Sequence, residues 1–339
     1  MTIIKQVQFG NSGLKISPLI IGCMTFGSTK WNSWLMEDKQ EVFRLLKYCY
    51  DQGLRTFDTA DQYSNGQSER ILGEFLRFYN IKRETVVIMT KIFFEVDETL
   101  DVPQSIKTAN DEIKLAVVNQ RGLSRKHIIA GVSNSCDRLG TYIDVLQIHR
   151  YDPETPMEET MRALNDVINS GEVRYIGASR MLATQFAEYQ FIAGKNGWHK
   201  FVNWQSQYNL LYREDEREVI PFAKRHNIAL TPYSPNAKGI LTRPWGSSTE
   251  RTGKGDPRLK MLMKCDREIV ERVRQLADRK NVSMAQISLS WILHKGCYPI
   301  IGVNSIPRVQ EAVVALQELS LSSEDISFLE EPYTPHKLV

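Results

Sequence analysis

The sequence lacks the features that mark secreted, membrane-spanning and nucleic-acid-binding proteins. Its five cysteines are widely spaced and include no Cys-x-x-Cys pair, which favours reduced thiols over a disulfide framework or a zinc site. The amino terminus has no signal-peptide core, and every apolar stretch is far shorter than the ~18 residues of a membrane span. The 43 basic and 40 acidic side chains leave a net charge of +3 without a long basic run, which argues against nucleic acid as the main partner. We therefore expect a cytoplasmic protein that associates with neither membranes nor nucleic acid.

Common motifs for nucleotide and metal binding are missing as well. No Gly-x-Gly-x-x-Gly fingerprint follows the first expected strand and the chain has no P-loop, so a bound dinucleotide would be held in another way. None of the six histidines pairs with another at ligand spacing, so metal-dependent hydrolysis is a weak alternative and we expect no metal.

What the chain does contain is a series of short apolar runs that alternate with helical patterns. The runs have the character of buried parallel strands and lie at residues 18–22, 55–58, 86–91, 143–149, 173–178, 201–205, 229–233 and 299–303. Helical spacing of apolar residues occurs at 37–52, 68–78, 156–170, 214–226, 266–280, 283–294 and 306–316. This alternation predicts an α/β fold: a single (β/α)8 TIM barrel over residues 1–339, with a β-hairpin around residues 9–14 and extra carboxyl-terminal helices. The length also permits two domains, but no change in composition marks a boundary.

Four polar side chains stand where the expected strands end. Asp58, Lys91 and His149 close three of the apolar runs, and Tyr63 lies just past the first of these. The carboxyl ends of parallel strands are where such barrels keep their chemistry. Lys91 could lower the pKa of the Tyr63 phenol, Asp58 could hold the ammonium, and His149 could orient a carbonyl or share the proton transfer. Taken singly, each residue could instead be structural, as a buried ion pair or a core histidine. Together they predict a proton-donating site, for which hydride is the natural partner.

The loops beyond the same strand ends predict a substrate pocket. Trp31 and Trp34 follow the first strand, Phe93 follows the third and Arg150 follows the fourth. Aromatic side chains suit flat or apolar carbonyl compounds, although ordinary loop packing explains any one of them equally well.

Several ordered stretches carry a resemblance to a known family. They are Thr56-Phe57-Asp58-Thr59-Ala60 followed by Tyr63, Gly177-Ala178-Ser179, Gln205-Ser206-Gln207-Tyr208-Asn209-Leu210, Tyr233-Ser234-Pro235 and Pro299-Ile300-Ile301-Gly302. In these the chain resembles the aldo-keto reductase superfamily, from Phe9 to about Leu329. Within the superfamily it is most similar to fungal aryl-alcohol-dehydrogenase-type reductases and versiconal hemiacetal acetate reductases.

The resemblance implies a cofactor, a substrate class and a set of binding residues. It implies NADPH across the carboxyl mouth of the barrel, an aldehyde or ketone as small-molecule substrate, and Tyr63 as proton donor. The residues that would hold the cofactor are Gly22, Met24, Asp58, Ser179, Arg180, Gln205, Tyr233, Ser234, Pro235, Asn236, Lys238, Gly239, Leu241, Arg243, Arg308 and Glu311. Among them, Ser179 and Gln205 would bond the nicotinamide carboxamide, Tyr233 would stack on the ring, and Arg308 would lie near the 2'-phosphate.

The chain departs from the superfamily at several of these positions. Arg180 stands where members often have Asn, and Asn236 stands where many have Leu. At the adenosine end, Gly302 and Ala312 replace a common Lys and Asn. Basic residues at positions 238, 243, 251, 254 and 258 could clamp phosphates or form an ordinary solvated loop.

Two other functions are compatible with the same residues. A barrel-strand lysine such as Lys91 can form a Schiff base in an aldolase. A protein of this fold can also bind the cofactor as a slow-turnover or non-enzymatic sensor subunit. The oligomeric state is left open.

Overall fold

The architecture is built on eight parallel strands. The computed structural model describes residues 3–100, 110–247 and 264–338. The strands are β3 Ile20–Gly22, β4 Thr56–Asp58, β5 Val87–Ile92, β6 Ile143–Ile148, β7 Val173–Ser179, β8 Phe201–Gln205, β9 Ala229–Leu230 and β10 Ile300–Gly302. They form one sheet in the order β10-β3-β4-β5-β6-β7-β8-β9. Each lies within, or one residue beyond, a strand predicted from the sequence.

Backbone hydrogen bonds close this sheet into a barrel between its first and last strands. The Tyr298 N–H donates to the Leu230 carbonyl at 2.8 Å, and the Ile300 N–H donates to the Pro232 carbonyl at 2.9 Å. These bonds join β9 to β10, as the closure of a barrel requires. The predicted (β/α)8 TIM barrel is confirmed.

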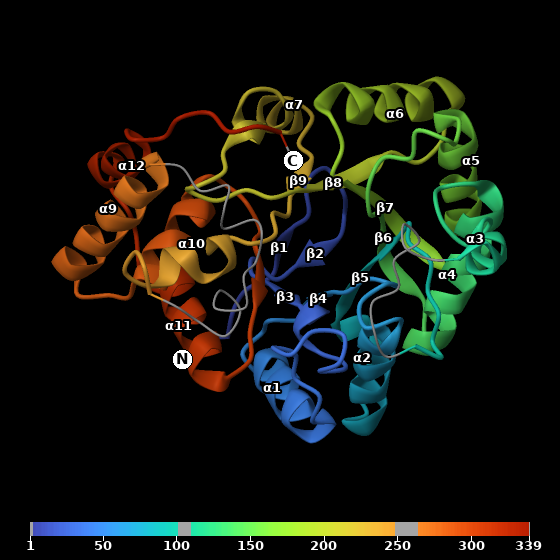
Figure 1. The fold of residues 1–339 in the computed structure, drawn as a ribbon, viewed down its shortest axis with the longest axis horizontal. Coiled ribbons are helices and arrows are strands. Elements are labelled where there is room, and N and C mark those ends of the chain that lie inside the picture. The colour runs from blue at the N-terminus through green and yellow to red at the C-terminus, as the bar shows by residue number, and fades with distance from the viewer. Residues whose placement is uncertain (1–2, 101–109, 248–263, 339) are drawn as a thin grey trace.

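Helices surround the strands, running in Figure 1 from α1 and α2 through α4, α5, α6 and α7 to α10 and α11. Their bounds are α1 Lys39–Asp51, α2 Gln67–Phe78, α3 Asp111–Val117, α4 Arg125–Leu139, α5 Met157–Asn169, α6 Ala183–Asn196, α7 Val219–Arg225, α9 Lys264–Lys280, α10 Met284–His294, α11 Ile306–Gln317 and α12 Ser323–Glu330. Short 3₁₀ turns occur at Cys23–Thr25, Arg83–Thr85, Glu214–Glu216 and Ala237–Thr242. Within the described part of the chain, no helix combines the length and apolar character needed to cross a membrane.

The continuous helix predicted at residues 214–226 is wrong. The segment forms a 3₁₀ turn, Glu214–Glu216, and only then the shorter helix α7. The Glu214 carboxylate accepts from the Tyr333 hydroxyl and from the His336 N–H, both at 2.7 Å. These contacts with the distant carboxyl-terminal segment favour the turn over the helix that the local apolar spacing indicates.

The amino-terminal hairpin covers one end of the barrel. Strands β1 Val7–Gln8 and β2 Lys15–Ile16 pair in antiparallel orientation. Phe9 is fully buried in a cluster with the barrel residues Met89 and Val145. This apolar plug lies toward the amino ends of the strands, so the chemistry is left to the carboxyl ends.

Candidate active site

The four side chains singled out from the sequence converge at the carboxyl end of the barrel. Asp58 is the last residue of β4, and Lys91 is the fifth of the six residues of β5. His149 directly follows β6, and Tyr63 lies in the loop between β4 and α2. Parallel strands end at a common rim, so four separate segments place their side chains in one place.

Lys91 is the centre of this group and uses all three of its hydrogens on neighbours. Its Nζ donates to Asp58 Oδ2 at 2.5 Å, to the Thr59 carbonyl at 2.7 Å and to Tyr63 Oη at 3.2 Å. The side chain is only 1% exposed. Burial opposes the charge of the ammonium, but Asp58 and Tyr63 outweigh it and raise the pKa of Lys91. Lys91 is therefore a fixed cation.

The hydroxyl hydrogen of Tyr63 is left for another acceptor, because an ammonium can only donate. Burial raises the pKa of Tyr63 above its ordinary value of 10.0, and Lys91 lowers it only in part. The expectation that Lys91 brings this pKa below the ordinary value is wrong, because desolvation of the phenolate outweighs the cation. The phenol is thus protonated at neutral pH and available as a proton donor.

His149 lies against the Tyr63 ring in an edge-on arrangement, with ring centroids 6.0 Å apart. Its Nδ1 is buried and has no hydrogen-bond partner within the described residues. Burial, followed by the charges of Lys91, Arg150 and Arg180, lowers the pKa of His149 well below its usual range. The imidazole is therefore neutral near pH 7, with one nitrogen that donates and one that accepts.

A polar network inside the barrel holds Asp58, and two of its members were not predicted. Asp58 Oδ1 accepts from Nε2 of Gln147 at 3.0 Å and from Nε2 of Gln205 at 2.9 Å. The Oε1 of Gln147 accepts from Gln205 at 2.8 Å and from Asn203 at 2.9 Å. Gln147 and Asn203 stand two residues before His149 and Gln205, on the same inward strand face. This alternation is the signal that could have identified them.

A buried ion pair supports the loop that carries Tyr63. Arg138 of α4 donates through Nε to Glu69 Oε2 of α2 at 2.7 Å, and both side chains are almost fully buried. At Gly66, where φ is +87°, a Cβ atom would lie only 2.6 Å from Arg138 Cδ. The lack of a side chain at Gly66 therefore lets the end of this loop pack closely on Arg138.

The segment after β9 has an unusual, tightly turned backbone. Ser234, Ala237, Lys238 and Gly239 have positive φ angles of 55°, 45°, 58° and 96°. The N–H groups of Ala237 and Gly239 already donate to the carbonyls of Ser234 and Asn236, so this tight backbone satisfies itself in part. The Asn236 Oδ1 in the same segment is buried without a hydrogen-bond partner within the described residues. Strained residues and an unpaired polar atom are typical of a ligand-binding segment.

Two arginines from distant parts of the chain meet beside this segment. Arg243 follows the turn Ala237–Thr242, and Arg308 lies in the first turn of α11. Burial, and then the charge of Arg308, lower the pKa of Arg243, so the two guanidinium groups repel each other. A cation in the first turn of a helix also opposes the helix dipole. A phosphate bound between the two arginines would offset both costs.

The other residues predicted to hold a cofactor differ in burial. Gly22, Ser179, Pro235 and Leu241 are buried, Met24, Tyr233 and Glu311 are half-buried, and Arg180 is exposed. Ser179 lies beside Gln205 in the pairing of β7 with β8. The Glu311 carboxylate accepts a hydrogen bond from Ser283, so it already joins α10 to α11. The basic positions 251, 254 and 258 lie outside the described residues.

Of the residues predicted to line a substrate pocket, Arg150 directly follows His149, and the buried Phe93 is linked to His149 through Phe94. The Phe94 ring is 5.2 Å from the His149 ring, and Phe93 packs against Phe94 at 5.1 Å. The Arg150 guanidinium lies over Phe94, with its Cζ 4.5 Å from the ring centroid. Aromatic walls and a cation thus border the neutral imidazole.

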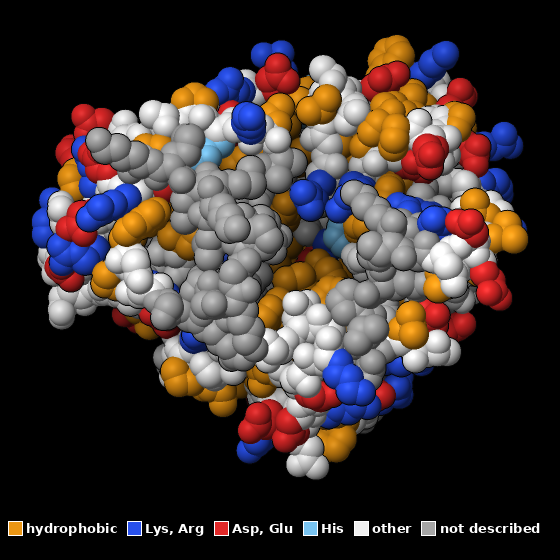
Figure 2. Space-filling view, in the orientation of Figure 1, with side chains coloured by type: hydrophobic (Ala, Val, Ile, Leu, Met, Phe, Trp, Pro, Cys, Tyr) orange, Lys and Arg blue, Asp and Glu red, His pale blue; other side chains and the backbone are white. Residues whose placement is uncertain are grey.

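The other two predicted pocket residues, Trp31 and Trp34, are half-buried in the loop between the Cys23–Thr25 turn and α1. Figure 2 shows a hollow near the middle of this face, with hydrophobic side chains inside it. Lys or Arg side chains gather with one His along its edge. An apolar hollow with a few polar groups at its border is the usual form of a small-molecule site.

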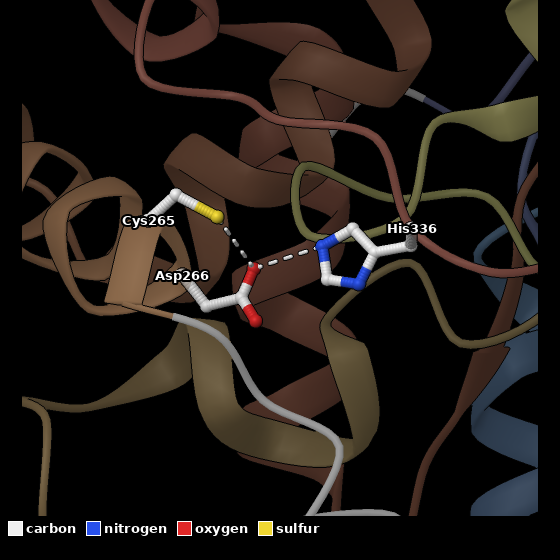
Figure 3. A group of neighbouring side chains, drawn as sticks. All are labelled: Cys265, Asp266 and His336. Carbon is white, nitrogen blue, oxygen red and sulfur yellow. Dashed lines mark hydrogen bonds and ion pairs between the residues drawn. The ribbon is translucent and has the colours of Figure 1, made fainter.

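A group of possible metal ligands lies away from the barrel strands. The donor atoms of Cys265, Asp266 and His336 are all within 4.8 Å of one another (Figure 3). His336 Nε2 is 3.3 Å from Asp266 Oδ1, and Cys265 Sγ is 3.9 Å from the same oxygen. A structural zinc site normally takes four protein ligands, whereas this group offers three. We assign to it the attachment of the carboxyl-terminal segment to α9.

Known proteins match this chain over almost its whole length. A sequence profile described as "Aldo/keto reductase family" matches residues 18–333. The chain is 62% identical to "Putative aryl-alcohol dehydrogenase AAD16" of Saccharomyces cerevisiae, with 99% of each chain covered. It is 50% identical to "Putative aryl-alcohol dehydrogenase C977.14c" of Schizosaccharomyces pombe, over 96% of this chain and 95% of that protein. It is 47% identical to the "Versiconal hemiacetal acetate reductase" of Aspergillus parasiticus, over 98% of this chain and 97% of that protein.

Proposed function

The chain belongs to the aldo/keto reductase family, and on that premise we propose that it is an NADPH-dependent carbonyl reductase with Tyr63 as proton donor. Members of this family are oxidoreductases that use NAD(P)H and act on small-molecule carbonyl compounds. The observation that carries the proposal is the hydrogen bond from Lys91 to Tyr63 Oη. Because Lys91 donates all its hydrogens, the phenol must direct its own hydrogen outward, toward a substrate oxygen.

The residues around the rim fit a phosphorylated dinucleotide. The backbone of Ser234 to Gly239 would follow the pyrophosphate, and Arg243 with Arg308 would hold the 2'-phosphate. Gln205 donates its amide hydrogens to Asp58 and Gln147, so its carbonyl oxygen is the atom left for the nicotinamide carboxamide. When bound, NADPH supplies hydride to the carbonyl carbon of the substrate.

The chain's own residues supply the proton. Tyr63 donates from Oη to the substrate oxygen as negative charge develops there, and Lys91 stabilises the phenolate that remains. A neutral His149 can donate a second hydrogen bond to the same oxygen from the ring nitrogen that carries its hydrogen. Asp58 keeps the ammonium in place throughout. In the reverse direction the phenolate accepts the proton of an alcohol.

The state of Lys91 separates this proposal from an aldolase. A Schiff base needs a neutral, free amine. Asp58 and Tyr63 raise the pKa of Lys91, and its hydrogens are all engaged. The amine is therefore charged and held away from a carbonyl carbon.

A direct assay distinguishes the reductase from a cofactor-binding sensor of the same fold. We expect NADPH oxidation, measured by loss of absorbance, when the protein meets a panel of aromatic and aliphatic aldehydes and keto esters. NADH serves as the parallel cofactor. Tight retention of NADPH with no oxidation by any carbonyl would refute the reductase and favour the sensor.

Cofactor preference should depend on Arg308. Replacing it with alanine removes one partner of the 2'-phosphate, so the KM for NADPH should rise about 10- to 100-fold while the KM for NADH changes little. Arg162→Ala, which removes an exposed arginine from α5, is the matched control. A similar rise for both cofactors would mean that Arg308 does not contact the 2'-phosphate.

The pH profile should show no histidine limb near pH 6.5. Because the pKa of His149 is lowered well below 6.5, the imidazole stays neutral as the pH falls through that value. We therefore expect kcat/KM to stay level between about pH 6 and pH 8, measured with saturating NADPH. A limb centred near pH 6.5 that disappears in His149→Gln would contradict the neutral imidazole.

A further inference from the structure

Two guanidinium groups beside the proposed active site have no acidic partner among the residues that the structure describes. Arg150 follows His149, and Arg180 follows Ser179 at the end of β7. In the described ranges 3–100, 110–247 and 264–338, no carboxylate forms an ion pair within 4.0 Å of either one. The neighbouring Arg121 differs, since its Nε lies 3.9 Å from the buried Glu95. Arg150 is half-buried, where an unpaired cation is costly, which points to an absent anion; Arg180 is exposed.

A row of rings fixes Arg150 relative to the proposed proton donor. The Arg150 Cζ lies 4.5 Å from the centroid of Phe94, whose ring is 5.2 Å from that of His149. The His149 ring in turn lies 6.0 Å from that of Tyr63. The guanidinium and the imidazole therefore both contact the Phe94 ring, and the phenol lies on from the imidazole. Its Nε is buried without a hydrogen-bond partner within the described residues.

The charges around His149 have one sign. Lys91, Arg150 and Arg180 each lower the pKa of His149, which places all three near the imidazole. Burial and the charge of Arg180 lower the pKa of Arg150 itself. Lys91 is neutralised by Asp58, whereas the two arginines repel each other with no carboxylate beside them in the described part of the chain. A negative group of the substrate would relieve this repulsion.

We propose that Arg150, with Arg180 beside it, binds a carboxylate on the substrate. The enzyme then prefers aldehydes and ketones that carry a negative charge at the far end from the carbonyl. A planar guanidinium binds a carboxylate through two parallel hydrogen bonds, and the Phe94 ring beside Arg150 offers an apolar contact to the part of the substrate between its carbonyl and its carboxylate. The inference rests on the carbonyl reduction proposed above.

The test compares para-formylbenzoate with its methyl ester, which differ in charge but share the reacting aldehyde. Wild-type kcat/KM should favour the carboxylate by about tenfold or more. Arg150→Met keeps an unbranched apolar stem over Phe94 but removes the charge, so the carboxylate-to-ester ratio should fall about 10- to 100-fold. Arg150→Lys should retain part of the preference for the carboxylate, because the positive charge remains but the paired hydrogen bonds of a guanidinium are lost. Arg121→Met, which removes a nearby but paired guanidinium, should keep the wild-type ratio.

The outcomes separate this inference from the proposed function. If the wild type reduces both compounds equally well, or if Arg150→Met keeps the wild-type ratio, the carboxylate site is wrong although the reductase stands. If Arg150→Met weakens NADPH binding and lowers both activities equally, Arg150 serves the cofactor phosphates instead. If the wild type reduces neither these compounds nor any neutral aldehyde, the proposed function itself fails.

Discussion

Replacing Tyr63 with phenylalanine should lower kcat for carbonyl reduction by about 100- to 10,000-fold, the usual contribution of a positioned general acid. The change removes one oxygen, and the ring can keep its edge-on contact with His149. Lys91 loses one of its three acceptors but keeps Asp58 and the Thr59 carbonyl. The fold and the affinity for NADPH should therefore remain nearly intact. Single-turnover absorbance measurements and a fluorescence titration with NADPH check the two parts separately.

Tyr151→Phe is the matched control for this prediction. Tyr151 follows Arg150 near the same rim, and its ring packs toward Tyr189 rather than toward the proposed donor. Its loss of a hydroxyl should leave kcat close to wild type. If Tyr63→Phe kept wild-type turnover, the proton would have to come from elsewhere, and the neutral His149 would be the next group to test.

The barrel was predictable because most strand residues are buried on both faces of the sheet, so that the strands appear as short apolar runs. The same pattern placed Asp58, Lys91 and His149 at strand ends, where a barrel collects its polar groups. Helix α4 was not predicted, because Gly131 and the residues Ser133–Asn134–Ser135 form helices poorly on their own. Its packing favours a glycine there, because a Cβ at Gly131 would lie 2.4 Å from Ile92 Cδ1 and the Ile92 side chain would have to shift. Such a contact is visible only in three dimensions.

The electrostatics of the site were harder to predict than the residues that form it. The sequence indicates a cation near the phenol, but the sign of the pKa shift of Tyr63 depends on how much water the fold excludes. The partners of Asp58 pose the same difficulty, because Gln205 lies 147 residues away along the chain. Inward-facing strand positions could have named Gln147 and Asn203 as candidates, but not the acceptor that each one bonds.

Replacing Lys91 with methionine should have the second large effect, and it acts on both stability and catalysis. Asp58 is 3% exposed, and its pairing with the ammonium offsets the cost of burying the carboxylate. The amides of Gln147 and Gln205 remain as donors in the variant, but they carry no charge. We expect the free energy of unfolding to fall by about 3–5 kcal/mol, the range found when one member of a buried ion pair is removed. Urea denaturation followed by circular dichroism measures it.

The double variant Asp58→Asn/Lys91→Met separates the two effects. It removes the charge that Lys91→Met leaves unpaired, so part of the lost stability should return. Activity should not return, because the phenolate formed when Tyr63 gives up its proton still lacks the adjacent cation. A double variant that recovered stability and turnover together would mean that Lys91 serves only the fold. A Lys91→Met protein as stable as wild type would mean that the attraction within the ion pair only offsets the cost of desolvating it. The ammonium would then serve catalysis alone.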